Sequence, residues 1–154
     1  REPAEIKLDL PLDANLSAGY VPKEELRLEA YRRLAEVTTD AQVADIRAEW
    51  EDRYGPVPEE AARLLDVARL RAEAHRLGVR EINVTKGPAF GGPAWTARVS
   101  PLVLKASQQI RLQRLFKGAV YKEQVEQLML PIPKTPDLAG TLVDLLRNLV
   151  PPAE

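Results

Sequence analysis

The 154-residue sequence contains no cysteine and only one histidine, His75. Without thiols the chain can form neither a disulfide nor a thiolate metal site. A metal would have to bind to Asp and Glu alone, and no calcium-loop spacing of these residues occurs. We therefore expect no metal and no other cofactor, and the absence of cysteine fits a reducing cytoplasm, where we expect this protein to reside.

Long apolar runs are also missing. None approaches the roughly 20 residues that span a bilayer, so we expect no membrane partner. Residues 1–5 lack the basic-then-apolar pattern of a secretion signal and resemble the cut end of a longer protein. We interpret residues 1–154 as one domain: a strand and linker at 1–19, a helical part at 20–81 and a mixed part at 82–154.

Signatures of catalysis are absent as well. The glycine-rich segment 87–93 lacks the GxxxxGK[ST] pattern of a phosphate loop, and its two prolines lack the N–H donors that a phosphate needs. No serine stands in a nucleophile elbow. His75 has no partner motif and is interpreted as a partly packed residue at a surface edge. We expect no enzymatic activity and no binding of ATP.

Charge nearly balances over the whole chain, with a formal net charge of −1. The distribution is uneven, because residues 22–81 carry eleven basic and fourteen acidic side chains, whereas residues 82–154 carry nine basic and five acidic ones. Bulk charge therefore favours neither nucleic acid nor a membrane as partner. The two halves are nevertheless expected to present different faces to partners.

The first half predicts one strand and three helices. Residues 5–10 alternate polar and apolar side chains, the period of a half-buried strand. A helix is expected from Pro22 to about Val37, a second over about 40–54, and a third over 58–77 that stops at Gly78. The third helix has apolar residues on two sides, separated by alternating charges, so we expect it to be packed on both sides. Those charges are Asp66, Arg69, Glu73 and Arg76.

The second half predicts a small antiparallel sheet and two further helices. Residues 79–86 and 94–99 are typical of strands joined by a turn, and residues 119–132 are largely extended. Pro101 favours a helix start that runs to about Phe116, and Asp137 is expected to cap a final helix. The predicted fold class is α+β, with the three-helix first half packed against this sheet.

An acidic stripe on the second helix is the first candidate site. Asp45, Glu49 and Asp52 recur at i, i+4 and i+7, opposite Val43, Ile46 and Trp50. Like charges at this spacing repel slightly, so the stripe gives the fold no advantage and favours a basic partner surface. The alternative interpretation is that these side chains only increase solubility.

A basic helix is the second candidate site. Arg111, Arg114 and Lys117 lie on one side of it and Lys122 follows, which would suit contacts with nucleic-acid phosphates. Phe116 and Tyr121 are the only aromatic residues nearby, too few for a platform on which bases stack. The alternative is an ordinary solvated surface.

Several short segments of residues 20–82 carry a resemblance to a known family. They are Tyr20-Val21-Pro22, Arg27, Tyr31-Arg32-Arg33-Leu34, Asp52-Arg53-Tyr54-Gly55-Pro56-Val57-Pro58, Leu64-Leu65-Asp66-Val67-Ala68-Arg69-Leu70-Arg71 and Leu77-Gly78-Val79. Together they resemble the C-terminal domain of the bacterial transcription-repair coupling factor. The resemblance implies a non-catalytic regulatory domain of an ATP-driven DNA translocase, which engages stalled RNA polymerase and recruits the repair protein UvrA. It further implies that the domain packs on the N-terminal UvrB-like module of the same protein, masks the UvrA-binding site and restrains the motor.

The same resemblance assigns a role to part of the acidic stripe. In the motif Glu49-Trp50-Glu51-Asp52-Arg53-Tyr54-Gly55, the carboxylates of Glu49 and Asp52 match those that would face a basic patch of the UvrB-like module. Asp45 is added from helical geometry alone. Helicase motifs of the translocase are absent from this sequence, so the resemblance is to the part that follows the motor.

Overall fold

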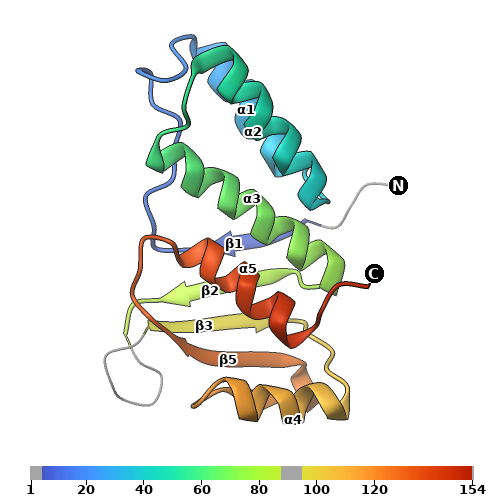
Figure 1. Cartoon of the computed structure of the whole chain (residues 1–154). Coiled ribbons are helices and arrows are strands. Elements are labelled where there is room, and N and C mark those ends of the chain that lie inside the picture. The colour runs from blue at the N-terminus through green and yellow to red at the C-terminus, as the bar shows by residue number, and fades with distance from the viewer. Residues whose placement is uncertain (1–4, 88–94, 154) are drawn as a thin grey trace.

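The computed structural model describes residues 5–87 and 95–153. In these ranges the chain forms α-helices, a mixed β-sheet and one short 3-10 turn at Glu123–Val125 (Figure 1). The elements are β1 (Lys7–Asp9), α1 (Glu24–Ala35), α2 (Asp40–Tyr54), α3 (Glu59–Leu77), β2 (Glu81–Thr85), β3 (Trp95–Ser100), α4 (Ala106–Leu115), β4 (Val120–Lys122), β5 (Gln127–Ile132) and α5 (Leu138–Leu149).

The sheet has the strand order β1-β2-β3-β5-β4. Strands β2 to β5 pair antiparallel, as predicted, but β1 pairs parallel with β2. Parallel neighbours need a crossover connection, and here α1, α2 and α3 supply it between β1 and β2. The α+β class is therefore confirmed, with a mixed rather than a purely antiparallel sheet. The predicted turn over 87–93 lies almost entirely outside the described residues.

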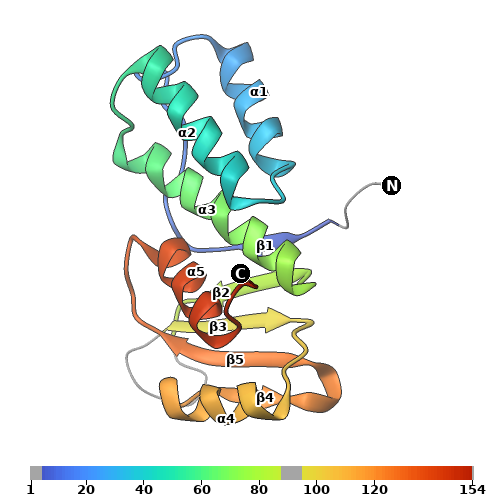
Figure 2. The same ribbon diagram turned by 45° about the vertical axis from the view of Figure 1, so that its right-hand side comes forward.

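Helix α3 lies between two hydrophobic cores, as its two apolar sides predicted. Figures 1 and 2 show α1 and α2 on one side of it and α5 with the sheet on the other. Ala61, Leu65, Ala68 and Ala72 pack toward α1 and α2, whereas Leu70 and Ala74 pack toward α5. We call the part built on α1 and α2 the helical lobe and the part built on the sheet, α4 and α5 the sheet lobe.

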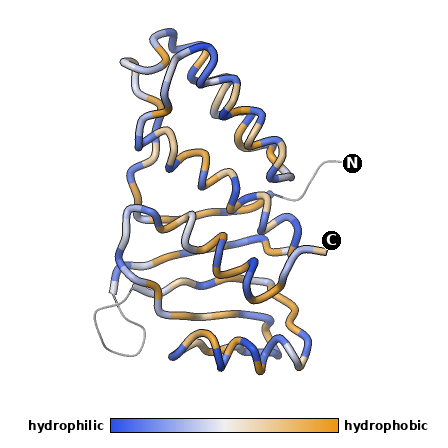
Figure 3. Tube along the Cα trace, viewed as in Figure 1, coloured by the Kyte–Doolittle hydropathy of each residue, from blue (hydrophilic) through white to orange (hydrophobic). Residues whose placement is uncertain are grey.

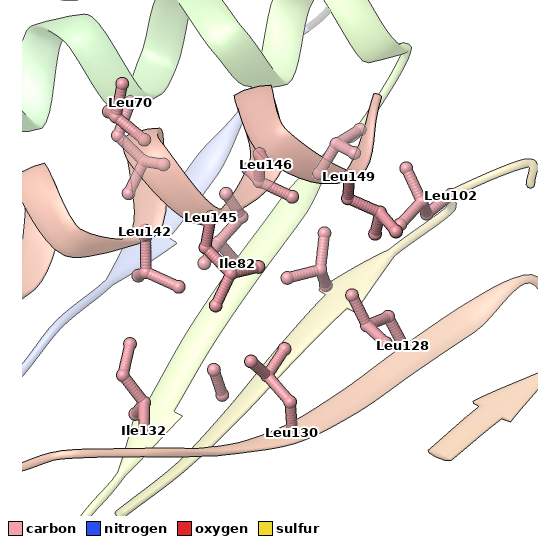
Figure 4. Packing of buried hydrophobic residues seen from close by; sticks show 14 of the residues in the cluster. Leu70, Ile82, Leu102, Leu128, Leu130, Ile132, Leu142, Leu145, Leu146 and Leu149 are labelled. Atoms are coloured by element: carbon pink, nitrogen blue, oxygen red, sulfur yellow. The ribbon is translucent and has the colours of Figure 1, made fainter. Parts of the chain in front are cut away.

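The core of the sheet lobe is aliphatic and fully enclosed. Helix α5 lays Leu142, Leu145, Leu146 and Leu149 over one face of the sheet (Figure 4). The face itself carries alternate residues of β2, β3 and β5, because side chains of a strand point to opposite sides in turn. These sheet residues are Ile82, Val84, Ala97, Val99, Leu128, Leu130 and Ile132.

Helix α4 begins later than predicted. Residues 101–105 are extended, and the helix starts at Ala106. Leu102 and Leu104 are buried, and Tyr121 holds this segment, since its hydroxyl donates to the Leu102 carbonyl at 2.6 Å and accepts from the Leu104 N–H at 3.2 Å. Burial of two alternate leucines in the core outweighs the preference of Pro101 for a helix start.

Hydrophilic and hydrophobic residues alternate along most of the helices (Figure 3), whereas β5 is largely apolar and buried. Within the described ranges, none of the helices is both long enough and apolar enough to cross a bilayer.

Candidate docking interface

Helix α2 is held firmly at its N-terminal end. Thr39 caps it: the Thr39 hydroxyl accepts from the Gln42 N–H at 3.3 Å, and the Gln42 side-chain oxygen accepts from the Thr39 N–H at 3.1 Å. These reciprocal bonds satisfy two donors that a helix start otherwise leaves free. The helix therefore begins at Asp40, directly after the short turn from α1.

The C-terminal end of α2 is fixed by an aromatic anchor. The Tyr20 hydroxyl donates to the Gly55 carbonyl at 2.9 Å, and the Tyr20 ring meets Tyr54 edge-on at 5.6 Å. Burial, followed by the charge of Glu51, raises the pKa of Tyr20, so the hydroxyl stays a neutral donor. Gly55 adopts a positive φ of 90°, which glycine accommodates without strain.

The inner side of α2 is buried as predicted. Val43, Ile46 and Trp50 are each at most 3% exposed and form the centre of the helical lobe. Because this side is packed and both ends are anchored, the outer side of α2 is a rigid surface.

The predicted acidic stripe lies on that outer side, with one difference. Asp45 and Asp52 are exposed, whereas Glu49 is half-covered and forms an ion pair with Arg33 of α1. Helical geometry gives the reason. Glu49 and Asp52 are separated by about 60° around the axis of α2, and Glu49 is the one on the flank that faces α1 and Arg33. We call Asp45, Glu49 and Asp52 the acidic face.

A shallow groove between α1 and α2 borders the acidic face. The charged residues that line one stretch are Glu29, Arg33, Glu49 and Arg53, and those that line the next are Arg33, Glu36 and Asp45. Two carboxylates of α1 and its C-terminal cap, Glu29 and Glu36, therefore extend the negative surface, and Arg33 lies between them. Sequence reasoning from α2 alone missed both residues, although their i and i+7 spacing places them on one side of a helix.

The basic residues of the second candidate site are spread over several elements. Arg114 is exposed on α4, Lys117 follows the helix, and Lys122 ends the edge strand β4. Arg111 is partly covered, and its Nε is buried without a hydrogen-bond partner. Exposed aliphatic side chains, Ile110 and Leu115, interrupt this surface, so it is less uniformly basic than the sequence predicted.

No group of three or more His, Asp or Glu side chains in residues 5–87 and 95–153 is arranged to hold a metal ion. His75 is exposed on the last turn of α3.

A network of charges links α2 to the sheet lobe through α3. Asp40, the first residue of α2, lies 3.2 Å from Arg69 of α3 and 3.7 Å from Arg147 of α5. Arg147 also lies 3.7 Å from Glu73, whose side chain is only 6% exposed. Arg76 holds Glu73 at 2.7 Å. The charge ladder predicted on α3 therefore joins three helices.

The fold is that of a coupling-factor C-terminal domain. The chain matches the structure described as "Crystal structure of C-terminal domain of transcription-repair coupling factor" with a TM-score of 0.77, over 97% of this chain and 94% of that one. The two sequences are 15% identical, so this match concerns the fold.

Sequence comparisons extend the likeness from fold to family. Residues 10–93 match the family model described as TRCF domain. The transcription-repair-coupling factor of Mycobacterium tuberculosis is 41% identical over 97% of this chain. Those of Staphylococcus aureus and Escherichia coli are 37% and 33% identical over 76% and 69% of it. The chain belongs to the transcription-repair coupling factor family, and it spans 12%, 9% and 10% of the length of these three relatives.

Proposed function

We propose that this chain is a non-catalytic regulatory domain that docks, through the acidic face of α2, on the N-terminal UvrB-like module of the same protein. The observation that carries the proposal is the acidic face itself: three carboxylates on the outer side of a helix whose inner side is buried and whose ends are anchored. Family membership makes the UvrB-like module the partner to test.

Docking of this kind would act as a reversible gate. In the closed state the domain masks the UvrA-binding site and restrains the ATP-driven motor. When carboxylates on an anchored helix meet a basic patch, the pairing of charges sets the register of the interface. The interface also stays reversible, because opening it breaks only surface contacts. Any change that weakens the closed state alone shifts the population toward the open one.

The proposal is tested by replacing Glu49 and Asp52 with Ala and titrating the chain with the UvrB-like module. If each lost charge pair contributes about 1.4 kcal/mol, the dissociation constant rises about tenfold per pair. In the full-length protein, the affinity for UvrA and basal ATP hydrolysis should both rise. The matched control is Glu51→Ala with Glu59→Ala, which removes two exposed negative charges outside the acidic face, one on α2 and one at the start of α3.

The proposal is contradicted if the Glu49 and Asp52 double variant is folded yet behaves like the control pair in module binding, UvrA affinity and basal ATP hydrolysis. The acidic face would then be an ordinary solvated surface. Folding is checked by urea unfolding, in which we expect both double variants to stay within about 1 kcal/mol of the parent chain, because exposed charges contribute little.

A second candidate function is binding of nucleic-acid phosphates by Arg111, Arg114, Lys117 and Lys122. It is favoured by the exposure of Arg114 and the two lysines and by the lack of any acidic residue in α4. Phosphate binding must weaken steeply as salt rises. A gel shift with the chain at low and at physiological salt separates this function from protein docking.

A further inference from the structure

The ion pair between Arg33 and Glu49 has a consequence for docking. Arg33 lies in the last turn of α1 with its side chain 47% exposed, and it reaches across the hairpin to Glu49, whose side chain is 42% exposed. Its guanidinium is therefore already paired with one of the three carboxylates that the proposed docking surface presents.

We propose that Arg33 weakens docking by acting as an internal competitor: it holds Glu49 in the free protein, and a basic partner side chain has to displace it or lie beside it. This inference rests on the proposed function. A guanidinium pairs with a carboxylate through a planar set of N–H donors, so Arg33 gives Glu49 the contact that a partner arginine would give.

Both outcomes of an encounter oppose binding. If the partner displaces Arg33, the apparent affinity equals the intrinsic affinity multiplied by the fraction of protein in which Glu49 is free. If Arg33 stays, a like charge lies beside the incoming cation and adds to that of Arg53, in a groove whose attraction for a cation comes from Glu29, Glu36 and Asp45. Removal of Arg33 should therefore tighten docking rather than loosen it.

The fold itself gains little from this pair. Both side chains are about half-exposed, and ion pairs at such positions contribute little to stability. The packing that joins α1 to α2 and α3 comes instead from residues such as Leu34 and Val37, which are at most 5% exposed. An effect of Arg33 on binding can thus be separated from an effect on folding.

The helix α2 provides a matched control. Arg47 pairs with Glu51 at 3.3 Å, with side chains 49% and 51% exposed, close to the values of the Arg33 pair. Glu51 does not belong to the acidic face. Arg47→Gln therefore removes the same charge from the same lobe without freeing a carboxylate of the docking surface.

The experiment titrates the chain and its variants with the UvrB-like module by calorimetry. We expect Arg33→Gln to lower the dissociation constant about three- to sixfold, the gain that freeing a half-exposed ion pair allows, and Arg47→Gln to change it less than twofold, since only the first frees Glu49. The gain should vanish when Glu49 is also replaced: Arg33→Gln with Glu49→Gln should bind no more tightly than Glu49→Gln alone. Thermal unfolding of each variant checks that the fold is intact.

Three results overturn the inference. If Arg33→Gln leaves the dissociation constant unchanged, Arg33 does not compete with the partner. If Arg33→Gln raises the dissociation constant, Arg33 instead positions Glu49 for docking. Equal tightening by Arg47→Gln, or a gain that survives the loss of Glu49, points to overall charge alone. If Glu49→Gln and Asp52→Asn weaken docking while Arg33→Gln does not tighten it, the inference fails and the proposed function stands. If none of these variants changes binding, both fail.

Discussion

The helical lobe and the sheet lobe are stabilised in different ways. The sheet lobe encloses mainly branched aliphatic side chains from α5 and from strands β2, β3 and β5, many of them fully buried. The helical lobe has a smaller core, in which Trp50 and Tyr20 belong to the same buried cluster as three small alanines of α3. The surface proposed for docking lies on this smaller lobe, so its position in space depends on how firmly α3 joins the two cores.

Two kinds of contact make that connection. Apolar residues of α3 contribute to both cores, so unfolding of α3 would expose the core of each lobe to water. The charges of Asp40, Arg69, Glu73 and Arg147 then connect α2, α3 and α5 directly. We therefore expect the lobes to unfold together, and substitutions at Trp50, Arg76 and Asp66 test how each kind of contact contributes.

The largest effect is expected from Trp50→Ala, which leaves a cavity at the centre of the helical lobe. Replacing a buried tryptophan by alanine costs roughly 3–5 kcal/mol. The remaining tryptophan, Trp95, lies in β3 and packs against the core of the sheet lobe, so its fluorescence during urea unfolding reports on the other lobe. If the lobes are coupled through α3, the Trp95 transition shifts by the same free energy as the loss of helical circular dichroism. A Trp95 transition that stays in place would show that the lobes unfold separately.

A smaller effect is expected from Arg76→Met, which removes the close partner of buried Glu73. The carboxylate then has only Arg147, at 3.7 Å, and the bond from Arg76 to the Val150 carbonyl at 2.7 Å is also lost. Breaking a buried pair on one side costs about 2–4 kcal/mol, because a charge is left poorly compensated. Arg47→Met is the control, with an expected loss below about 1 kcal/mol at an exposed pair. Equal losses in urea unfolding would mean that the burial of Glu73 does not make its ion pair more important than an exposed one.

The smallest effect, of opposite sign, is expected from Asp66→Asn. Burial raises the pKa of Asp66 despite the nearby Arg69, so ionisation of this carboxyl opposes folding. A raised carboxyl pKa means that the stabilising contribution is present at low pH and is lost as the pH rises through the folded-state value. At neutral pH the Asn variant should therefore equal or exceed the parent chain by up to about 1 kcal/mol.

That difference should shrink in acid, where Asp66 itself becomes neutral. Urea unfolding at neutral and at acidic pH measures it, with Asp144→Asn, an exposed carboxylate of α5, as the control. A clear loss of stability at neutral pH would show that the ion pair with Arg69 outweighs the cost of burial.

Local patterns predicted the elements and the two-sided α3 because period and caps act over a few residues. The stop at Gly78, with its left-handed φ of 73°, and the cap at Thr39 are of this kind. Contacts between residues that are far apart in the sequence leave no such local pattern. The alternation over 5–10 predicts a strand but not that it pairs parallel with β2, and Leu102 and Leu104 are extended because a distant core needs them.

The candidate site was likewise predictable only where it depends on local helical geometry. The outward direction of Asp45 and Asp52 follows from helical geometry, and the structure agrees with it. The ion pair of Glu49 could not be predicted from α2 alone, since it depends on how closely α1 packs and on which α1 side chain reaches the flank. The links from Asp40 to Arg69 and Arg147 likewise require the tertiary arrangement of three helices.

The position of α3 also has a mechanical consequence. A partner that pulls on α2 would transmit force through Asp40 and the shared core residues into α3, and from there into α5 and the sheet. Helix α5 approaches α3 closely at Gly140, where an added Cβ would lie 3.4 Å from an Asp66 oxygen, so the two helices have little room to slide. Under tension we expect the chain to resist as one body and then to yield in a single step, at a rate governed by its unfolding barrier.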